Sequence, residues 1–137
     1  MRNVLGVLMA IVGFALFMSV IWAGCGAFLK NNEAYERGLA TALADPLVQE
    51  TLGGPVRESW FLNGAIEGDG GTTRGSWSTR LRGEAASGTL YIVGFKQNGR
   101  WGVVGMSLTA AGATYTYRAG QGFVRADPEA LPTYDIL

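Results

Sequence analysis

The sequence predicts an α+β fold, in which one amino-terminal membrane helix precedes two helices packed on a four- to five-stranded antiparallel meander sheet. Residues 4–29 carry no charge, and apolar residues then recur at helical spacing up to residue 52. From residue 56 onward the apolar pattern changes to the period of two that is typical of strands. Because the strands follow the helices instead of alternating with them, we expect the helices to cover one face of the sheet.

The length of 137 residues fits one small domain beside the membrane segment. We expect a transmembrane anchor over residues 1–29, an α+β domain over residues 30–119 and an irregular carboxy-terminal tail over residues 120–137. Glycines punctuate the short apolar segments of the domain, as they do in antiparallel sheets with tight turns.

The composition argues against most enzymes and against nucleic acid as a partner. Eleven basic and eleven acidic side chains balance, so the chain offers no excess of Lys and Arg for phosphates. Histidine, the commonest general base and metal ligand, is absent, and a single cysteine forms neither an intramolecular disulfide nor a thiolate-rich zinc site. We therefore expect no enzymatic activity, no metal and no cofactor.

The membrane segment comprises the 26 uncharged residues 4–29, flanked by Arg2 and Lys30. As a helix it would be ~39 Å long, which exceeds the ~30 Å hydrocarbon core of a bilayer, so it spans with some tilt. A cleaved secretory signal has a shorter apolar region. Lipidation of Cys25 stays open as an alternative, because Ala23-Gly24-Cys25 ends like a lipobox, although Trp22 stands where an aliphatic residue is expected.

The orientation of this segment follows from its position more than from its charges. Lys and Arg residues near its two ends nearly balance, so the positive-inside rule barely decides. Three residues before a long apolar run resemble an uncleaved signal anchor. We therefore expect a cytoplasmic amino terminus and an extracytoplasmic domain.

Small residues recur every fourth position in the membrane segment and form a possible helix-association seam. On a helix they would lie along one side and let another membrane helix approach closely. The members of this seam are Ala15, Ser19, Ala23 and Ala27.

Two short helices are predicted directly after the membrane segment. Asn32 caps the first, whose acidic first turn suits a helix amino terminus and which ends near Ala44. Asp45 and Pro46 begin the second, which closes at Gly53.

The strands are predicted from alternation and turn signals. Trp60, Leu62 and Ile66 share one parity in the first strand, and Trp77 and Leu81 do so in the second. The third strand, residues 89–97, is apolar on both parities, as in a central strand covered on both faces. The dipeptide after it, Asn98-Gly99, predicts a tight hairpin to a fourth strand, residues 100–109, and residues 113–118 form a possible fifth.

Two sets of surface candidates follow from these strands. Arg74, Arg80 and Arg82 have equal parity and form a possible basic stripe, which could meet anionic lipids or an acidic partner. A solvated sheet face explains them as well. The tryptophans at positions 60, 77 and 101 are expected in core and cross-strand packing instead of a ligand platform.

Several short motifs, in this order and spacing, make residues 4–110 resemble the cytochrome oxidase complex assembly protein family. The residues that carry the resemblance are Tyr35, Leu52, Gly53, Pro55, Trp60, Gly64, Gly88, Asn98, Gly99 and Trp101. The resemblance implies a small single-pass membrane protein whose soluble fold is similar to that of a presequence-translocase subunit. It also implies a non-enzymatic role in assembling a respiratory oxidase, with other membrane proteins such as oxidase subunits as partners. No Arg-rich and Ser-rich presequence precedes the apolar segment, so a bacterial cell membrane fits better than a mitochondrial one.

Two classes of function agree with these observations. The first is an assembly or interaction module tethered to the membrane. The second is a membrane-tethered domain, or lipoprotein, that binds a small ligand and has no role in oxidase assembly. A filled core with an exposed apolar patch would favour the first, and an apolar pocket of a few hundred Å³ lined by tryptophans would favour the second.

Overall fold

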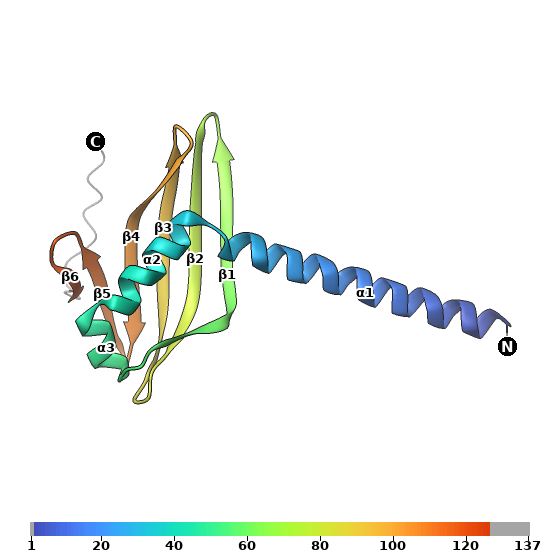
Figure 1. Cartoon of the computed structure of the whole chain (residues 1–137), viewed down its shortest axis with the longest axis horizontal. Coiled ribbons are helices and arrows are strands. Elements are labelled where there is room, and N and C mark those ends of the chain that lie inside the picture. The colour runs from blue at the N-terminus through green and yellow to red at the C-terminus, as the bar shows by residue number, and fades with distance from the viewer. Residues whose placement is uncertain (1, 127–137) are drawn as a thin grey trace. The chain divides into compact units, whose positions relative to one another are not determined.

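The computed structural model describes residues 2–126, except for the side chains of Arg2, of residues 22–28 and of Asp69. The chain divides into two compact units after Asn32. The first unit holds helix α1, Arg2–Lys30, and the second holds two helices and six strands in its described part, residues 33–126 (Figure 1).

Helix α1 is long and apolar enough to cross a membrane over Asn3–Ile21. The described side chains of this span are exposed to solvent, as those of a lipid-facing helix would be in the absence of lipid. The hydroxyl of Ser19 donates a hydrogen bond of 2.8 Å to the carbonyl of Ala15 one turn earlier, so this polar group is satisfied within the helix.

Two short helices, α2 (Glu33–Ala44) and α3 (Pro46–Leu52), open the second unit, as the sequence predicts. Glu33 and Glu36 lie in the first turn of α2, where negative charge is favourable. The carboxylate of Asp45 caps α3 by accepting hydrogen bonds from the next backbone N–H groups, and Gly53 ends that helix with a positive φ of 74°.

The sheet is an antiparallel meander in which each strand pairs with the next, so the spatial order is β1-β2-β3-β4-β5-β6. The tight turn between β3 and β4 has Asn98 and Gly99 at φ values of 52° and 75°, which confirms the predicted hairpin. The strands are β1 (Arg57–Asp69), β2 (Thr72–Arg82), β3 (Ser87–Gln97), β4 (Arg100–Ala110), β5 (Ala113–Arg118) and β6 (Gly122–Arg125).

The core lies between the two helices and one face of the sheet, which we call the inner face (Figure 1). Helix α2 lies close to the strands because small residues meet there. A Cβ atom placed on Gly94 would be 2.9 Å from that of Ala34, and one placed on Gly38 would be 3.0 Å from the Ile92 side chain. The largest fully buried side chains are Trp77, Tyr35, Leu52, Leu81, Leu90, Ile92, Leu108 and Val48.

The prediction of four or five strands was too low, because part of the expected tail forms a sixth. Strand β6 pairs with β5 and buries Phe123. The backbone N–H of Phe123 donates to the second carboxylate oxygen of Asp45 at 3.0 Å, which attaches this short strand to the start of α3. The rest of the expected tail, residues 127–137, lies outside the described residues.

Two predictions of burial were also wrong. Trp60 was expected in the core, but 85% of its surface is exposed, because a bulge in β1 turns it away from the inner face. Strand β3 was expected to be covered on both faces, but the helices cover only one, and Tyr91 and Phe95 stay 47% and 36% exposed.

Candidate functional site

The face of the sheet opposite α2 and α3, which we call the outer face, is open to solvent over its central strands. Burial alternates strictly along β3 from Ser87 to Tyr91, and along β2 from Gly75 to Arg82. Period-two alternation places the side chains of Tyr91 and Phe95 on this outer face. A solvated sheet face is normally polar, so large apolar groups here make this face a candidate binding surface.

Tyr91 and Phe95 of β3 lie on this face, and the exposed Val104 of β4 follows Val103, the register partner of Gly94 between them; we call these three residues, Tyr91, Phe95 and Val104, the outer patch. Val104 is the extra residue where the register between β3 and β4 shifts, and it is 60% exposed. The guanidinium of Arg74 lies 5.9 Å from the ring centroid of Phe95, within the range of a cation–π interaction. The outer patch is therefore apolar with a basic margin.

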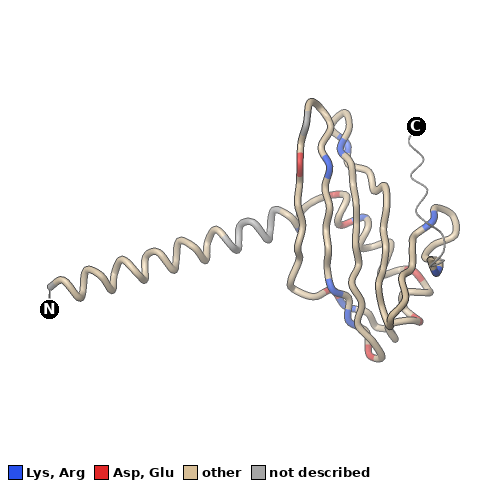
Figure 2. Tube along the Cα trace, turned by 180° about the vertical axis from the view of Figure 1, so that it is seen from behind, with Lys and Arg blue, Asp and Glu red and all other residues tan. Residues whose placement is uncertain are grey.

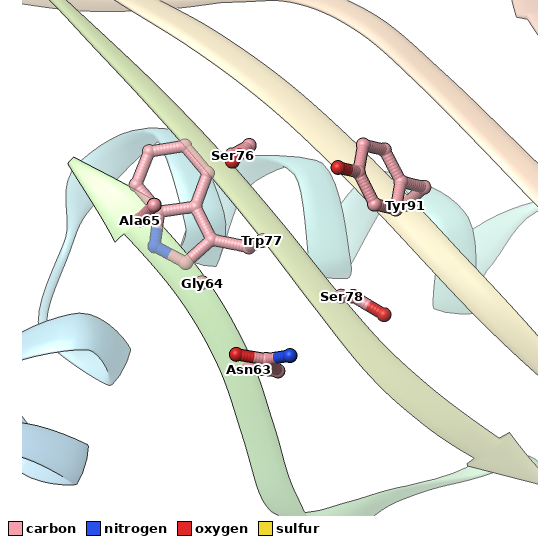
Figure 3. Close-up of a pocket in the computed structure, with 7 residues that line it drawn as sticks. All are labelled: Asn63, Gly64, Ala65, Ser76, Trp77, Ser78 and Tyr91. Carbon is pink, nitrogen blue, oxygen red and sulfur yellow. The ribbon is translucent and has the colours of Figure 1, made fainter. Parts of the chain in front are cut away.

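A shallow hollow of about 180 Å³ lies beside the outer patch (Figure 3). Asn63, Ser78 and Tyr91 occupy one row across β1, β2 and β3, because their Cα atoms are register partners. Gly64 lies under the indole of Trp77, whose buried Nε1 has no hydrogen-bond partner among the described residues. The complete lining is Asn63, Gly64, Ala65, Ser76, Trp77, Ser78 and Tyr91.

A polar contact on the inner face fixes the start of α2 to β1. The hydroxyl of Tyr35, a residue only 2% exposed, donates a hydrogen bond of 2.5 Å to Oε1 of Glu58. Burial, followed by this hydrogen bond, raises the pKa of Tyr35 far above its ordinary value. A neutral phenol that is buried between α2 and the sheet stabilises the fold and is not suited to attack on a substrate.

No group of three or more His, Cys, Asp or Glu side chains within the described part of the chain could hold a metal ion. Asp45 uses both carboxylate oxygens on backbone N–H groups, and Glu58 accepts from Tyr35. Both carboxylates therefore stabilise the fold through hydrogen bonds within the chain.

The predicted basic stripe is split along β2. Arg74, Arg80 and Arg82 are all exposed, but Arg74 and Arg80 are six positions, or ~20 Å of strand, apart. Arg74 accompanies Phe95, whereas Arg82 lies directly opposite Arg57 of β1. The structure thus groups Arg57, which the sequence did not single out, with Arg80 and Arg82.

The predicted helix-association seam is described only in part. Ala15 and Ser19 lie in the exposed part of α1. The side chains of Ala23 and Ala27, and that of Cys25, lie outside the described residues. The seam and the lipidation of Cys25 stay predictions.

The residues that carry the family resemblance occupy mainly turns and contacts of the inner face. Leu52 is buried, and its carbonyl accepts from the backbone N–H groups of Ala85 and Ala86, which joins the end of α3 to the turn between β2 and β3. Trp101 packs edge to face on Trp77 at 5.7 Å. Pro55 follows a cis peptide bond, and Gly88 packs against Ala110.

Sequence reasoning missed the exposed apolar residues, although a signal for them exists. Trp60, Phe61 and Leu62 are consecutive, and a strand with one buried face cannot bury three consecutive side chains. The apolar residues on both parities of β3 carry the same signal for Tyr91 and Phe95.

The family model described as cytochrome oxidase complex assembly protein 1 matches residues 5–117 of the chain. This match covers more than half of the sequence and includes α1, both short helices and all strands up to β5. Neither a curated protein nor a solved structure matches the chain.

Proposed function

Because the chain belongs to the family of cytochrome oxidase complex assembly protein 1, we propose that it assists the assembly of a cytochrome oxidase without catalysing a reaction. Helix α1 anchors it in a bacterial cell membrane, with the amino terminus in the cytoplasm and the second unit outside. The outer patch binds a membrane protein of the oxidase while that complex is incomplete.

The exposure of the outer patch is the observation that carries this proposal. Tyr91, Phe95 and Val104 are 47%, 36% and 60% exposed on a sheet whose other face holds a filled core. Leaving such groups in water forgoes the free energy that their burial would provide, ~25 cal/mol for each Å² of apolar surface. A protein partner would bury them, and aromatic residues are common at the centre of such interfaces.

The helix α1 supports the membrane part of the proposal. It has the length and composition of a membrane span, and its apolar stretch ends at Lys30, shortly before the second unit. A partner helix could pack on Ala15 and Ser19, where the small-residue seam begins. An anchored module of this kind meets oxidase subunits in the same bilayer, where diffusion in two dimensions favours encounter.

Binding of a small ligand is a second candidate function, and the hollow near Tyr91 is the observation that favours it. The side chains of Asn63, Ser76 and Ser78 in its lining could form hydrogen bonds with a ligand there. The volume of about 180 Å³ is below the ~300–1,000 Å³ typical of ligand pockets, so the first function fits better.

Deleting the gene in the organism that encodes the chain tests the proposed function. We expect the reduced-minus-oxidised haem spectrum of the membranes to show less assembled oxidase, because incomplete complexes lose a binding partner. The wild-type chain should restore the signal, whereas Tyr91→Ser with Phe95→Ser should not, although it reaches normal levels in the membrane. The matched control is Thr109→Ala with Thr114→Ala, which changes exposed residues elsewhere on the sheet. Unchanged oxidase in the deletion strain would contradict the proposal.

A further inference from the structure

Strand β1 contains an irregularity that exposes two neighbouring aromatic residues. Its register with β2 shifts between Glu58, which pairs with Leu81, and Leu62, which pairs with Thr79. Three residues of β1 therefore stand opposite the single residue Arg80. Such a bulge interrupts the hydrogen-bond ladder and redirects side chains, and it makes this part of the sheet edge unsuited to pairing with another strand.

Trp60 and Phe61 leave the sheet at this bulge. Trp60 is 85% exposed and Phe61 is 55% exposed, and their rings contact each other edge to face at 5.9 Å between centroids. Among the described residues of the second unit, Trp60 is the most exposed large apolar side chain. Tryptophan is enriched in the headgroup layer of membranes, where its N–H is hydrated and the rest of its ring contacts apolar groups, and Phe61 extends the apolar part of this pair.

Three arginines lie on β1 and β2 next to the bulge in the strand register. Arg80 stands opposite the bulge, and Arg57 and Arg82 are register partners across β1 and β2, so two like charges face each other directly. Figure 2 shows basic residues near the end of the sheet where β1 begins and β2 ends. Like charges in this arrangement repel unless an anion lies between them. Among the described residues, no carboxylate forms an ion pair with any of the three.

The covalent connection limits the distance between the end of α1 and the start of α2. Only Asn31 and Asn32 separate Lys30 from Glu33, so the Cα atoms of the two helix ends are at most ~11 Å apart. Within the second unit, Tyr35 attaches the start of α2 to Glu58, which lies two residues before Trp60. The bulge is therefore near the point where the chain leaves the second unit toward the membrane.

We propose that Trp60, Phe61, Arg57, Arg80 and Arg82 form a membrane-contact site, the bulge anchor, which enters the headgroup layer of the bilayer that α1 crosses. The aromatic rings occupy the boundary between headgroups and acyl chains, and the arginines bind the phosphates of anionic lipids. The inference rests on the membrane anchoring in the proposed function. A second contact besides α1 would restrict rotation of the second unit and hold the outer patch in a defined direction for its partner.

A bilayer fits this site better than a protein does. The occupant must supply both an apolar layer and closely spaced anions, and a phospholipid surface supplies the two together. It is also present wherever α1 is inserted, and only Asn31 and Asn32 separate α1 from α2. The outer patch, by contrast, lies on β3 and β4 and has no pair of adjacent exposed aromatic residues like Trp60 and Phe61.

Quenching of a fluorophore by nitroxide-labelled lipids tests the bulge anchor in the full chain. The variant Trp60→Cys in a Cys25→Ala background is labelled with an environment-sensitive fluorophore. It is placed in nanodiscs that contain phosphatidylglycerol and no other membrane protein. We expect quenching at position 60 and little at Thr114→Cys, an exposed site on β5. Replacing Arg57, Arg80 and Arg82 by Gln should lower the ratio of docked to free domain about fivefold per arginine. The matched control, Arg118→Gln with Arg125→Gln on β5 and β6, should change nothing.

A label on the native Cys25 separates this inference from the proposed function. If Cys25 is quenched and position 60 is quenched no more than position 114, the chain is anchored but the bulge anchor is wrong. If Cys25 is not quenched either, the membrane anchoring fails, and the inference fails with it. If position 60 becomes shielded only after solubilised membrane proteins are added, the pair binds protein, which also overturns the proposal. Thermal unfolding followed by circular dichroism checks that each labelled variant is folded.

Discussion

At the scale of single residues, Tyr35 holds the start of α2 on the sheet through both its ring and its hydroxyl. Its ring lies 6.4 Å from that of Trp77, and its hydroxyl donates to Glu58. Because Glu58 lies just before the bulge of β1, this contact also sets where Trp60 and Phe61 lie relative to the first turn of α2.

Tyr35→Phe should lower the free energy of unfolding by about 1–2 kcal/mol, because the change removes a hydrogen bond to a carboxylate and keeps the ring in place. Chemical denaturation of the full chain in detergent, followed by circular dichroism, measures the loss. Tyr91→Phe is the matched control, since the side chain of Tyr91 is 47% exposed, and it should stay within about 0.5 kcal/mol of the wild type. Equal stabilities of the two variants would contradict the structural role of the Tyr35 hydroxyl.

The pH dependence of the free energy of unfolding, compared between the wild type and Tyr35→Phe, tests the same side chain in a second way. The raised pKa of Tyr35 means that the unfolded chain releases this proton at a lower pH than the folded chain does. The folded state therefore loses stability as pH rises above the ordinary tyrosine value of 10.0, and is unaffected by this group below it. Tyr35→Phe should lose less stability than the wild type between neutral pH and pH values above 10.0. If the free energies of unfolding of the two proteins changed in parallel with pH, the raised pKa of Tyr35 would be contradicted.

At the scale of secondary-structure elements, Asp45 connects α3 to the last described strand. One carboxylate oxygen accepts from the N–H of Leu47 at 2.9 Å, and the other accepts from the N–H of Phe123 at 3.0 Å. The second contact joins residues 78 positions apart in the sequence. The Asp45 side chain therefore caps α3 and also attaches strand β6 to the start of that helix.

Asp45→Ala should destabilise the second unit by about 2–3 kcal/mol, because it removes a helix cap and leaves the buried N–H of Phe123 without its acceptor. Hydrogen exchange should show faster exchange of the Phe123 amide than of amides in β3. Asp45→Asn, which keeps one side-chain oxygen, should show an intermediate loss. Unchanged protection of the Phe123 amide in Asp45→Ala would contradict the attachment of β6.

The same element scale shows which parts of the fold are predictable from the sequence. Asn98-Gly99 and the Asp45-Pro46 pair act on adjacent backbone, so local chemistry suffices to place the hairpin and the start of α3. Strand β6 has four residues, and its attachment depends on Asp45 far away in the sequence, so no local pattern reveals it. The bulge in β1 breaks the parity from which the burial of Trp60 was inferred.

At the scale of the whole molecule, apolar residues serve three different surroundings. Those of α1 match a bilayer, those of the inner face form the core, and those of the outer patch are left exposed. The sequence pattern separates the first from the others by length, but it does not separate a buried core face from an exposed binding face. For this reason the family resemblance could be recognised from the sequence, whereas the outer patch and the bulge anchor required the fold.

Photocrosslinking in living cells tests most directly the claim that the outer patch binds a membrane protein of the oxidase. A photoreactive phenylalanine analogue replaces Tyr91 in the full chain, and the same analogue at Thr114 serves as the control on the same sheet. After irradiation, mass spectrometry identifies the crosslinked partners. We expect an oxidase subunit in the Tyr91 products and not in the Thr114 products. The absence of any oxidase subunit from the Tyr91 products, or its equal presence in both, would contradict the account.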